Sequence, residues 1–524
     1  MLAALTAALS LTPAASGATQ AAPGAVAPVK PEIKPEAQRE VKPQSAPTFA
    51  EHVAPIIHRH CAACHRPGQV GPFNLLSFAD VAKRAEMVGT VVRDRYMPPW
   101  KPVIGHGEFA NERRLSDAEL ATIDAWVLAG APEGDPAKTP ALPAFPEGQW
   151  PLGKPDLVLK MEQAYPVPAQ GRDEYRWFVL PLALPEDKWV KAVDFRPSSR
   201  AVVHHALFFL DDTGHARKLD GADGKPGFGG MRSRISGRLG GYVPGATPAP
   251  FPVDLALHLP RQSDFLLQVH FHPSGKAAQE QSEVALYFAD KPPSRKLLPL
   301  QLPPAFGRGA GIDVPPGEAN YRIEESFTLP ADATAWNVSG HAHYICREMR
   351  LTATLPDGTR KRLLYIDDWD LDWQDRYDFR EPIRLPKGTV IKSEIVWDNS
   401  PTNPNNPFSP PRRIRWGRES TDEMGSITLM LTADRVADEP ILQRAYLKHM
   451  ATVVRGAAAD ATERLIENAM DRLDANRDGK LQRSEAPARL NSKLFDRLDT
   501  NRNGELDEKE LQPLEDLLER ARGS

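Results

Sequence analysis

FLLQVHFH, residues Phe265–His272, has the length and composition of a single β-strand. It is rich in aromatic and branched apolar residues, and Pro273 follows it, which is typical of a strand that ends in a turn. Two other runs have the same character, Ala201–Leu210 (AVVHHALFFL) and Ala335–Tyr344 (AWNVSGHAHY). Short runs of this kind, separated by Pro and Gly, recur between residues 150 and 435. They predict an all-β region.

The three runs hold six of the chain's 14 histidines, in three pairs: His204 with His205, His270 with His272, and His341 with His343. Residues i and i+2 of a strand project from one face, so the third pair can reach a single ion. The adjacent first pair points to opposite faces and needs a bulge, a strong twist or different ring nitrogens to converge. One such pair is more often an ordinary part of a sheet, but three pairs together predict metal binding.

HHALFFL, LLQVHFHPSG, SGHAHY and TDEMGSITLML, in this order, resemble the copper type II, ascorbate-dependent monooxygenases over roughly residues 150–435. That family includes the peptidylglycine α-hydroxylating and dopamine β-monooxygenases. The resemblance implies two copper ions, one held by His204, His205 and His270 and the other, catalytic one by His341, His343 and Met424. Imidazole suits both copper oxidation states and a thioether favours Cu(I), although Met is otherwise common as core filling. His272 has no counterpart in the family, and we expect it to support a ligand.

The sequence departs from the peptide-amidating members of the family. Ser339, Ser426 and Thr428 stand where those members carry an Arg, an Asn and a Tyr that hold a peptide carboxylate. A glycine-extended peptide is therefore not the expected substrate. The chain also has only 3 Cys, of which Cys346 is expected to be a small buried apolar residue.

Cys61-Ala62-Ala63-Cys64-His65 is a C-x-x-C-H motif. Two thioethers at this spacing hold a haem c, and the adjoining imidazole takes one axial position of the iron. A CxxC disulfide beside an incidental His is the alternative, but it would be expected near a βαβ pattern. Residues 47–135 resemble a small class I cytochrome c, because helical spacing recurs at Phe49–His60, Ser77–Arg95 and Ser116–Ala129.

Met97 is the expected sixth iron ligand, since it lies on the Pro-stiffened loop 96–100. Met87 falls in a helical pattern and is expected in the core. A bis-histidine haem is the alternative, through His58, His60 or His106, each expected at the surface.

Two EF-hand loops are predicted near the end of the chain. Each has oxygen donors at loop positions 1, 3, 5 and 12, a backbone carbonyl ligand at position 7 and Gly at position 6. Acidic surface turns without bound ions are the alternative. The expected calcium ligands are Asp474, Asn476, Asp478, Lys480 and Glu485 in the first loop, and Asp499, Asn501, Asn503, Glu505 and Glu510 in the second.

Composition places the chain among soluble globular proteins, with 41% hydrophobic and 26% charged residues. A net charge of −4 argues against nucleic acid as a partner. No apolar run after the N-terminus is long enough to span a membrane. The opening apolar segment resembles a secretory signal without its basic region, and the C-x-x-C-H motif also favours export, so the expected location is periplasmic or secreted in a bacterium.

The expected fold class is multidomain, with a small all-α cytochrome c domain, two antiparallel β-sandwiches of jelly-roll type and an α-helical EF-hand pair. The expected boundaries are 1–18 for the signal peptide, 19–46 for an Ala/Pro-rich linker, 47–135 for the cytochrome c domain, 150–290 and 291–435 for the sandwiches, and 460–522 for the EF-hand pair.

These features predict an exported copper-dependent monooxygenase that hydroxylates a C–H bond of an unidentified small molecule with dioxygen. Its cofactors would be haem c, two copper ions and calcium. The fused haem would take the place of ascorbate, and a periplasmic electron donor would reduce it. The alternative is a periplasmic haem and copper protein for electron transfer or copper binding, without hydroxylase activity. Convergence of both metal-ligand sets, with an open, substrate-sized cleft beside Met424, would favour the enzyme.

Overall fold

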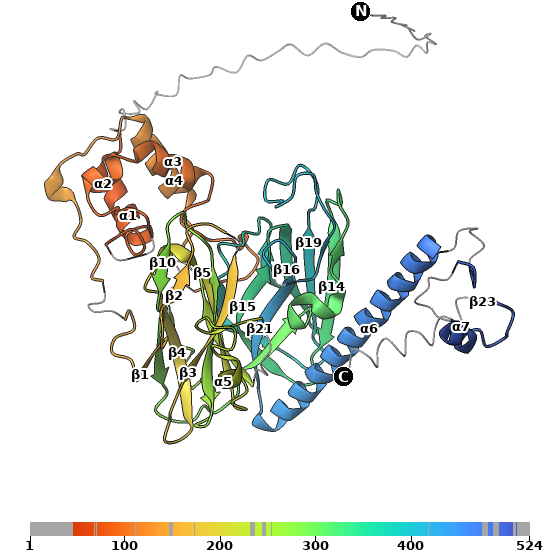
Figure 1. Cartoon of the computed structure of the whole chain (residues 1–524). Helices are drawn as coiled ribbons and strands as arrows, with labels where there is room; N and C mark the ends of the chain where they lie inside the picture. The colour runs from red at the N-terminus through yellow and green to blue at the C-terminus, as the bar shows by residue number, and fades with distance from the viewer. Residues whose placement is uncertain are drawn as a thin grey trace, which may run out of the picture. The chain divides into compact units, whose positions relative to one another are not determined.

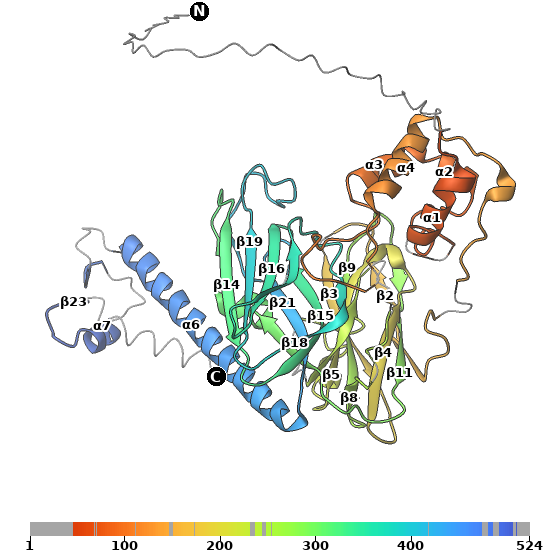
Figure 2. The same ribbon diagram turned by 180° about the vertical axis from the view of Figure 1, so that it is seen from behind.

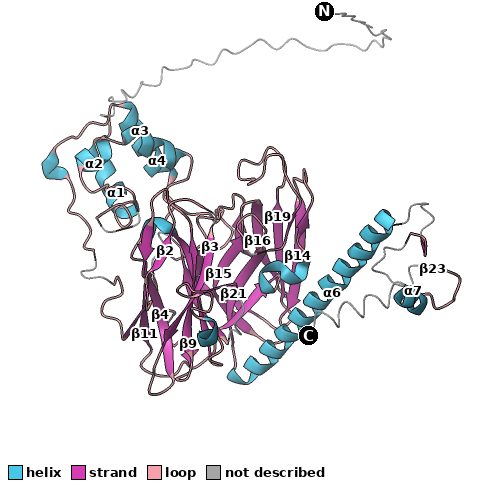
Figure 3. Cartoon of the chain, viewed as in Figure 1, coloured by secondary structure: helices cyan, strands magenta, loops and turns pink. Residues whose placement is uncertain are grey.

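The computed structural model describes residues 46–67, 69, 71–110, 112–145, 150–171, 173–230, 236–243, 248–252, 254–417, 419–473, 480–485, 492–506 and 510. The predicted signal peptide and nearly all of the predicted linker lie outside these residues. So do Asp474, Asn476 and Asp478 of the first predicted calcium loop. Strands hold 34% of the residues and helices 20%, so the chain is mainly β (Figure 3).

Short helices form the first part of the described chain (Figure 1). The capping box predicted before the last of them is present, because the Ser116 hydroxyl accepts the N–H of Glu119 and the Glu119 carboxylate accepts that of Ser116. Buried side chains such as Ile57, Ile123 and Trp126 form a small core between the helices. The elements are a π-helical turn (Phe49–Val53), α1 (Ala54–His60), α2 (Phe78–Ala82), α3 (Ala85–Arg93) and α4 (Asp117–Leu128).

The predicted fold class is wrong, because these helices do not form a separate all-α domain. Residues 47–524 make one compact unit. Between α3 and α4 the chain runs away from the helices. Phe109 there forms a β-bridge with Phe379 and is buried among side chains of the strands between residues 298 and 433. Helical periodicity predicts where helices lie but not the surface on which the residues between them pack. The predicted boundaries themselves stay predictions.

The strands from residue 157 to 288 form a first sheet pair, whose neighbouring strands are all antiparallel (Figure 2). A five-stranded sheet has the order β6-β3-β9-β5-β7, a four-stranded sheet the order β1-β11-β4-β8, and β10 pairs with β2. Phe178, Phe208 and Leu267 from the first sheet share a core with Phe195 and Leu286 from the second. The strands are β1 (Leu157–Lys160), β2 (Tyr165–Val167), β3 (Glu174–Pro181), β4 (Lys188–Arg196), β5 (Val203–Asp211), β6 (Phe228–Gly229), β7 (Gly237–Tyr242), β8 (Leu257–Leu259), β9 (Asp264–Phe271), β10 (Ala278–Glu280) and β11 (Glu283–Phe288).

The strands from residue 298 to 433 form a second sheet pair, with the orders β12-β21-β15-β18 and β14-β19-β16-β17, while β13 pairs with β20. Leu429 from one sheet and Met349 and Ile395 from the other share its core. Cys346 is 3% exposed in this core, as the sequence predicted. The strands are β12 (Leu298–Leu302), β13 (Asp313–Val314), β14 (Tyr321–Thr328), β15 (Ala333–Ala342), β16 (Cys346–Thr354), β17 (Arg360–Ile366), β18 (Arg376–Leu385), β19 (Val390–Trp397), β20 (Ile414–Arg415) and β21 (Gly425–Ala433).

A long helix, α6 (Glu439–Leu473), follows the second sheet pair and is attached to it where the Tyr446 hydroxyl donates to the carbonyl of Gln301 (3.0 Å). No helix among the described residues is both long and apolar enough to cross a membrane. The remaining elements are α5 (Ala216–Leu219), β22 (Leu481–Gln482), α7 (Ser492–Leu498), β23 (Glu505–Leu506), and 3-10 turns at Pro136–Lys138, Arg200–Val202, Ala305–Ala310 and Val436–Asp438.

Candidate metal centres

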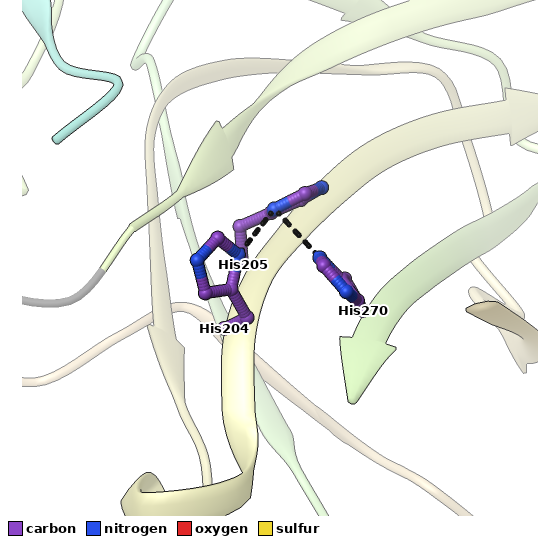
Figure 4. Close-up of side chains that lie close together, drawn as sticks. All are labelled: His204, His205 and His270. Atoms are coloured by element: carbon purple, nitrogen blue, oxygen red, sulfur yellow. Dashed lines mark hydrogen bonds between the residues drawn. The ribbon is translucent and has the colours of Figure 1, made fainter. Parts of the chain in front are cut away.

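The first histidine set lies on β5 and β9, two neighbouring strands of the five-stranded sheet (Figure 4). The strand register places His205 directly opposite His270. It shifts between Val203 and His205, so His204 is the extra residue of a β-bulge. A bulge changes which way a side chain points, and it brings the two adjacent histidines to one side. One of the irregularities that the sequence required is therefore present.

The three rings converge through their Nδ1 atoms. Nδ1 of His205 lies 3.1 Å from Nδ1 of His204 and 3.3 Å from Nδ1 of His270. The outer nitrogens are engaged elsewhere, since Nε2 of His204 is 2.6 Å from Asp372 Oδ1 and Nε2 of His270 is 2.8 Å from Asp173 Oδ2. A carboxylate that accepts one ring N–H leaves the lone pair of the other nitrogen free, which is the usual arrangement behind a metal-binding histidine.

Burial keeps His205 and His270 uncharged at neutral pH. Burial, reinforced by the neighbouring imidazoles, lowers the pKa of His205 well below its usual value. Burial also lowers the pKa of His270 to about 4, although its bond to Asp173 opposes the shift. Neutral imidazoles are the form that binds metal. Among the described residues, these three make a group of His, Cys, Asp or Glu side chains whose ligand atoms lie within 4.8 Å of one another.

Asp173 connects the first set to other parts of the chain. Its second oxygen lies 2.8 Å from Nδ1 of His272, which is therefore bonded beside the set and is not part of it. Oδ2 of Asp173, the oxygen that contacts His270, also accepts a hydrogen bond from the Ser420 hydroxyl (3.0 Å). The Ser420 hydroxyl in turn lies 3.1 Å from the Tyr175 hydroxyl. Burial alone would raise the pKa of Asp173, but these bonds hold it below its usual range. The carboxylate is thus charged and oriented.

The second set lies at the end of β15 and the start of β21. Nε2 of His341 is 3.4 Å from the sulfur of Met424, and the rings of His341 and His343 are 5.5 Å apart. The Nδ1 atoms have other partners, because that of His341 meets the amide oxygen of Gln374 (2.6 Å) and that of His343 the carbonyl of Asp422 (3.2 Å). Burial lowers the pKa of His343 to about 3. His341 and Met424 are half-buried, whereas His343 is 3% exposed.

Glu423 organises this set, a role that the sequence did not predict. Its carboxylate is fully buried and accepts the N–H groups of His343 (3.0 Å), Ile345 (2.8 Å) and Met424 (3.2 Å), and the indole N–H of Trp397 (3.0 Å). Burial raises the pKa of Glu423 to about 8, against the effect of these donors. One side chain therefore fixes the backbone on both sides of the set. An acid directly before the Met was visible in the sequence, but its buried position was not.

The β17–β18 loop, residues 367–375, supplies a further pair of residues that the sequence did not single out. Asp372 contacts His204 of the first set and Gln374 contacts His341 of the second. Nothing in the local pattern marks them, because they belong to neither histidine run.

The C-x-x-C-H motif follows α1 directly. The His65 N–H donates to the carbonyl of Cys61 (2.9 Å), and Nδ1 of the His65 ring is 3.1 Å from the carbonyl of Phe73. That bond leaves Nε2 as the free nitrogen. A Cβ on Gly71 would lie 2.7 Å from Nδ1 of His65, so only glycine fits against this ring. Both motif cysteines are unpaired, as thioether attachment requires.

The candidates for the sixth iron ligand differ in their surroundings. Met97 is half-buried. Met87 was expected in the core but is 52% exposed, because it lies on the outer side of α3. His58 was expected at the surface but is only 6% exposed, and His60 is bonded to Glu119 (3.2 Å). His58 and Ala63, together with Pro55, Arg59, Pro140, Ala141, Pro143 and Phe145, line a cavity of about 420 Å³.

The second EF-hand loop is already closed by hydrogen bonds. The Asp499 carboxylate accepts the N–H groups of Asn503 (3.0 Å) and Gly504 (2.9 Å), and the Glu510 carboxylate accepts that of Asn501 (3.1 Å). Gly504 has a φ of +82°, which the turn at loop position 6 needs. Leu481 and Gln482 of the first loop pair with Leu506 and Glu505 of the second, so the two loops meet through β22 and β23.

The first calcium loop is described only in part. Of its predicted ligands, Lys480 forms an ion pair with Glu505 (2.7 Å), and Glu485 accepts the N–H of Gln482 (3.0 Å). The other three lie outside the described residues.

Comparison with known proteins supports the second predicted EF-hand loop, because a family model described as EF hand matches residues 490–513, and the first loop stays a prediction. No curated protein matches the chain. Among solved structures, the major capsid protein P2 of bacteriophage PM2 is 10% identical over 53% of this chain and 97% of that chain, with a TM-score of 0.23. A peptide-N(4)-(N-acetyl-β-D-glucosaminyl) asparagine amidase is 10% identical over 53% and 96%, with a TM-score of 0.23. Such low scores carry no argument about this chain. The resemblances to copper monooxygenases and to cytochromes c rest on its residues alone.

Proposed function

We propose that the chain is an exported copper-dependent monooxygenase that hydroxylates a C–H bond of a small molecule with dioxygen. The observation that carries this proposal is the convergence of three imidazole nitrogens at a β-bulge. Imidazoles alone suit zinc, iron and nickel as well as copper. The sulfur of Met424 beside His341 favours copper, because a thioether is a soft ligand that stabilises Cu(I).

The first set has the spacing that an ion needs. Two nitrogens each about 2.0 Å from one ion lie about 3.3 Å apart in a tetrahedral arrangement. Nδ1 of His205 lies 3.1 and 3.3 Å from its two neighbours. Without a cation, the Nδ1 atoms of His204 and His270 compete for the single proton that Nδ1 of His205 can donate, and one of them is left without a donor. A bound ion would remove this conflict.

The second set offers the nitrogens and the sulfur of a more open site. The amide oxygen of Gln374 and the carbonyl of Asp422 lie against the Nδ1 atoms of His341 and His343, so Nε2 would be the nitrogen of each ring that faces an ion. Copper held there would supply the one-electron chemistry that activates dioxygen. His341 and Met424 are half-buried and His343 is not exposed, so dioxygen and substrate would approach from the side of His341 and Met424.

The strand register bears on the substrate. Ser426 is paired with His341, and Thr428 with Ser339, on neighbouring strands. These positions offer hydroxyl groups and no cation, so they do not suit a peptide carboxylate. We propose a small-molecule substrate without a carboxylate that needs to be held there.

Cys61, Cys64 and His65 would hold a haem c, which would supply electrons one at a time. The carbonyl of Phe73 and the close contact with Gly71 fix the ring of His65 with Nε2 free. Met97 remains our proposed sixth ligand. Because haem of this type is attached outside the cytoplasm, the proposed location is periplasmic or secreted, with a periplasmic protein as the electron donor. Calcium in the EF-hand loops completes the proposed set of cofactors.

The test compares Met424→Ala with Met430→Ala, a control on the same strand, in copper-loaded protein. Met424→Ala should keep copper at the first set but abolish substrate-dependent oxygen consumption, because only the second set has the thioether. Metal analysis gives the number of copper ions per chain, and an oxygen electrode follows oxygen consumption with each of a panel of small molecules. Undiminished turnover in Met424→Ala would contradict the assignment. If copper binds and the intact protein never consumes oxygen, the chain is an electron-transfer or copper-binding protein.

A further inference from the structure

The β17–β18 loop contacts a ligand of each histidine set. The Asp372 carboxylate lies 2.6 Å from Nε2 of His204, and the Gln374 amide oxygen lies 2.6 Å from Nδ1 of His341. Both contacts are short and well within hydrogen-bonding range. Because the two loop residues are separated by a single residue, one short piece of backbone holds both sets.

The residue between them, Trp373, points to the proposed haem region. Its ring meets that of Tyr96 edge to face, with centroids 6.5 Å apart. Tyr96 directly precedes Met97, the proposed iron ligand. The indole nitrogen of Trp373 is buried and has no hydrogen-bond partner among the described residues. A buried N–H without a hydrogen-bond partner lowers the free energy of unfolding. Hydrogen bonding therefore does not explain why the Trp373 ring lies here.

Ion pairs hold the loop against the segment that follows Met97. Lys101 pairs with Asp368 (2.9 Å) near one end of the loop, and Arg113 pairs with Asp375 at the other. The N–H of Val103 also donates to the carbonyl of Tyr365, just before the loop (2.8 Å). Several contacts of this kind act together, so the separation between Tyr96 and Trp373 is set from both sides.

We propose that the β17–β18 loop carries electrons from the haem to the first histidine set, through Tyr96, Trp373, Asp372 and His204. This inference rests on the proposed function and adds the path by which electrons reach the copper. One electron leaves a ferrous haem iron, which becomes ferric, and reduces a cupric ion held by His204 to cuprous; no bond breaks and no proton moves. Electron tunnelling decays less steeply through packed and bonded atoms than across a gap. Tyr96, Trp373 and Asp372 supply such a path.

The placement of Trp373 is tested first, without turnover. Cupric ions quench the fluorescence of a nearby indole, so copper bound to haem-free protein should quench the emission of Trp373. The difference between the intact chain and Trp373→Phe isolates this emission from that of the other tryptophans. Trp189→Phe is the matched control, since the ring of Trp189 also contacts another ring, that of His258 (centroids 4.7 Å apart), but on a different sheet. Equal quenching losses in the two variants would overturn the placement.

The route is tested by mixing pre-reduced haem protein with cupric ions without oxygen and following the haem absorbance. We expect Trp373→Leu to slow haem reoxidation several-fold, Trp373→Phe to slow it less, and Trp189→Leu to leave it unchanged. Copper stoichiometry and the haem spectrum must stay as in the intact chain. Equal rates in Trp373→Leu and Trp189→Leu overturn the route but leave the proposed function standing. If the haem of the intact chain is not reoxidised, the route is overturned and the haem is not the electron donor. Copper-dependent oxygen consumption still tests the monooxygenase activity by itself.

Discussion

At the scale of single residues, the carboxylates behind the histidines decide which ring nitrogen faces an ion. Nε2 of His204 and Nε2 of His270 are each hydrogen-bonded to an aspartate, and the Nδ1 atoms of both rings lie next to Nδ1 of His205. Without that partner either nitrogen could carry the proton, and the ring would lose its fixed orientation. The convergence of the first set therefore depends on residues that do not themselves join it.

Asp173→Asn should weaken copper binding at the first set by about 10–100-fold, the usual effect of losing such a partner. Asp173 holds His270, His272 and Ser420 together, and an amide of the same size cannot accept all three bonds. Competition with a chelator measures the affinity. Asp187→Asn is the control, because Asp187 also bonds a histidine, His258, but at an exposed pair (3.0 Å). Equal affinities in the two variants would contradict the role of Asp173.

Asp194 gives a prediction for the dependence of stability on pH. It is 7% exposed, one of its oxygens has no described hydrogen-bond partner, and burial raises its pKa from 3.8 to about 6. An acid with a raised pKa binds its proton more tightly in the folded state, so it costs stability as pH rises from about 4 to about 6. Asp194→Asn is neutral throughout. Its advantage should be below about 1 kcal/mol at pH 4 and reach at most about 3 kcal/mol above pH 7.

Thermal unfolding of the intact chain and of Asp194→Asn, at a series of pH values, measures this difference. A difference in Tm that is the same at pH 4 and pH 7.5 would show that the carboxylate is not the cause.

At the scale of elements, the strands that carry the histidines were predictable and their surroundings were not. The runs around His204, His270 and His341 fall on β5, β9 and β15, because aromatic and branched apolar residues are concentrated in them. The sequence also showed that the adjacent pair needed an irregularity, and the bulge at His204 supplies it. Such reasoning works where a pattern is local.

The missed residues of the candidate sites are those that depend on chain contacts distant in sequence. Asp173, Asp372 and Glu423 bond to His270, His204 and His343, which lie 97, 168 and 80 positions away in the sequence. No local period marks such residues, and an isolated acid in a sequence is most often solvated. The exposure of Met87 and the burial of His58 were misjudged for a related reason. Which side of a short helix is covered depends on the segments that pack against it.

At the scale of the whole molecule, one segment of the predicted haem domain, around Phe109, shares a core with the sheets, while the helices keep a small core of their own. Phe109 is 3% exposed, stacks on Phe379 of β18 at 5.5 Å and lies with Tyr377 in the core of the second sheet pair. Ion pairs from Lys101 and Arg113 reach the loop that precedes β18. The chain is therefore expected to unfold with these parts coupled.

Phe109→Ala tests this coupling. Removing a buried Phe costs about 3–5 kcal/mol, and here the loss should fall on the second sheet pair, although Phe109 lies within the predicted haem region. Hydrogen exchange should show faster exchange of the β18 amides in Phe109→Ala. In the control, Phe78→Ala, the loss should stay in the helices, because Phe78 packs only against their core among the described clusters. Unchanged β18 exchange in Phe109→Ala would mean that the sheets are stable without this segment, and that the haem region is a separate folding unit after all.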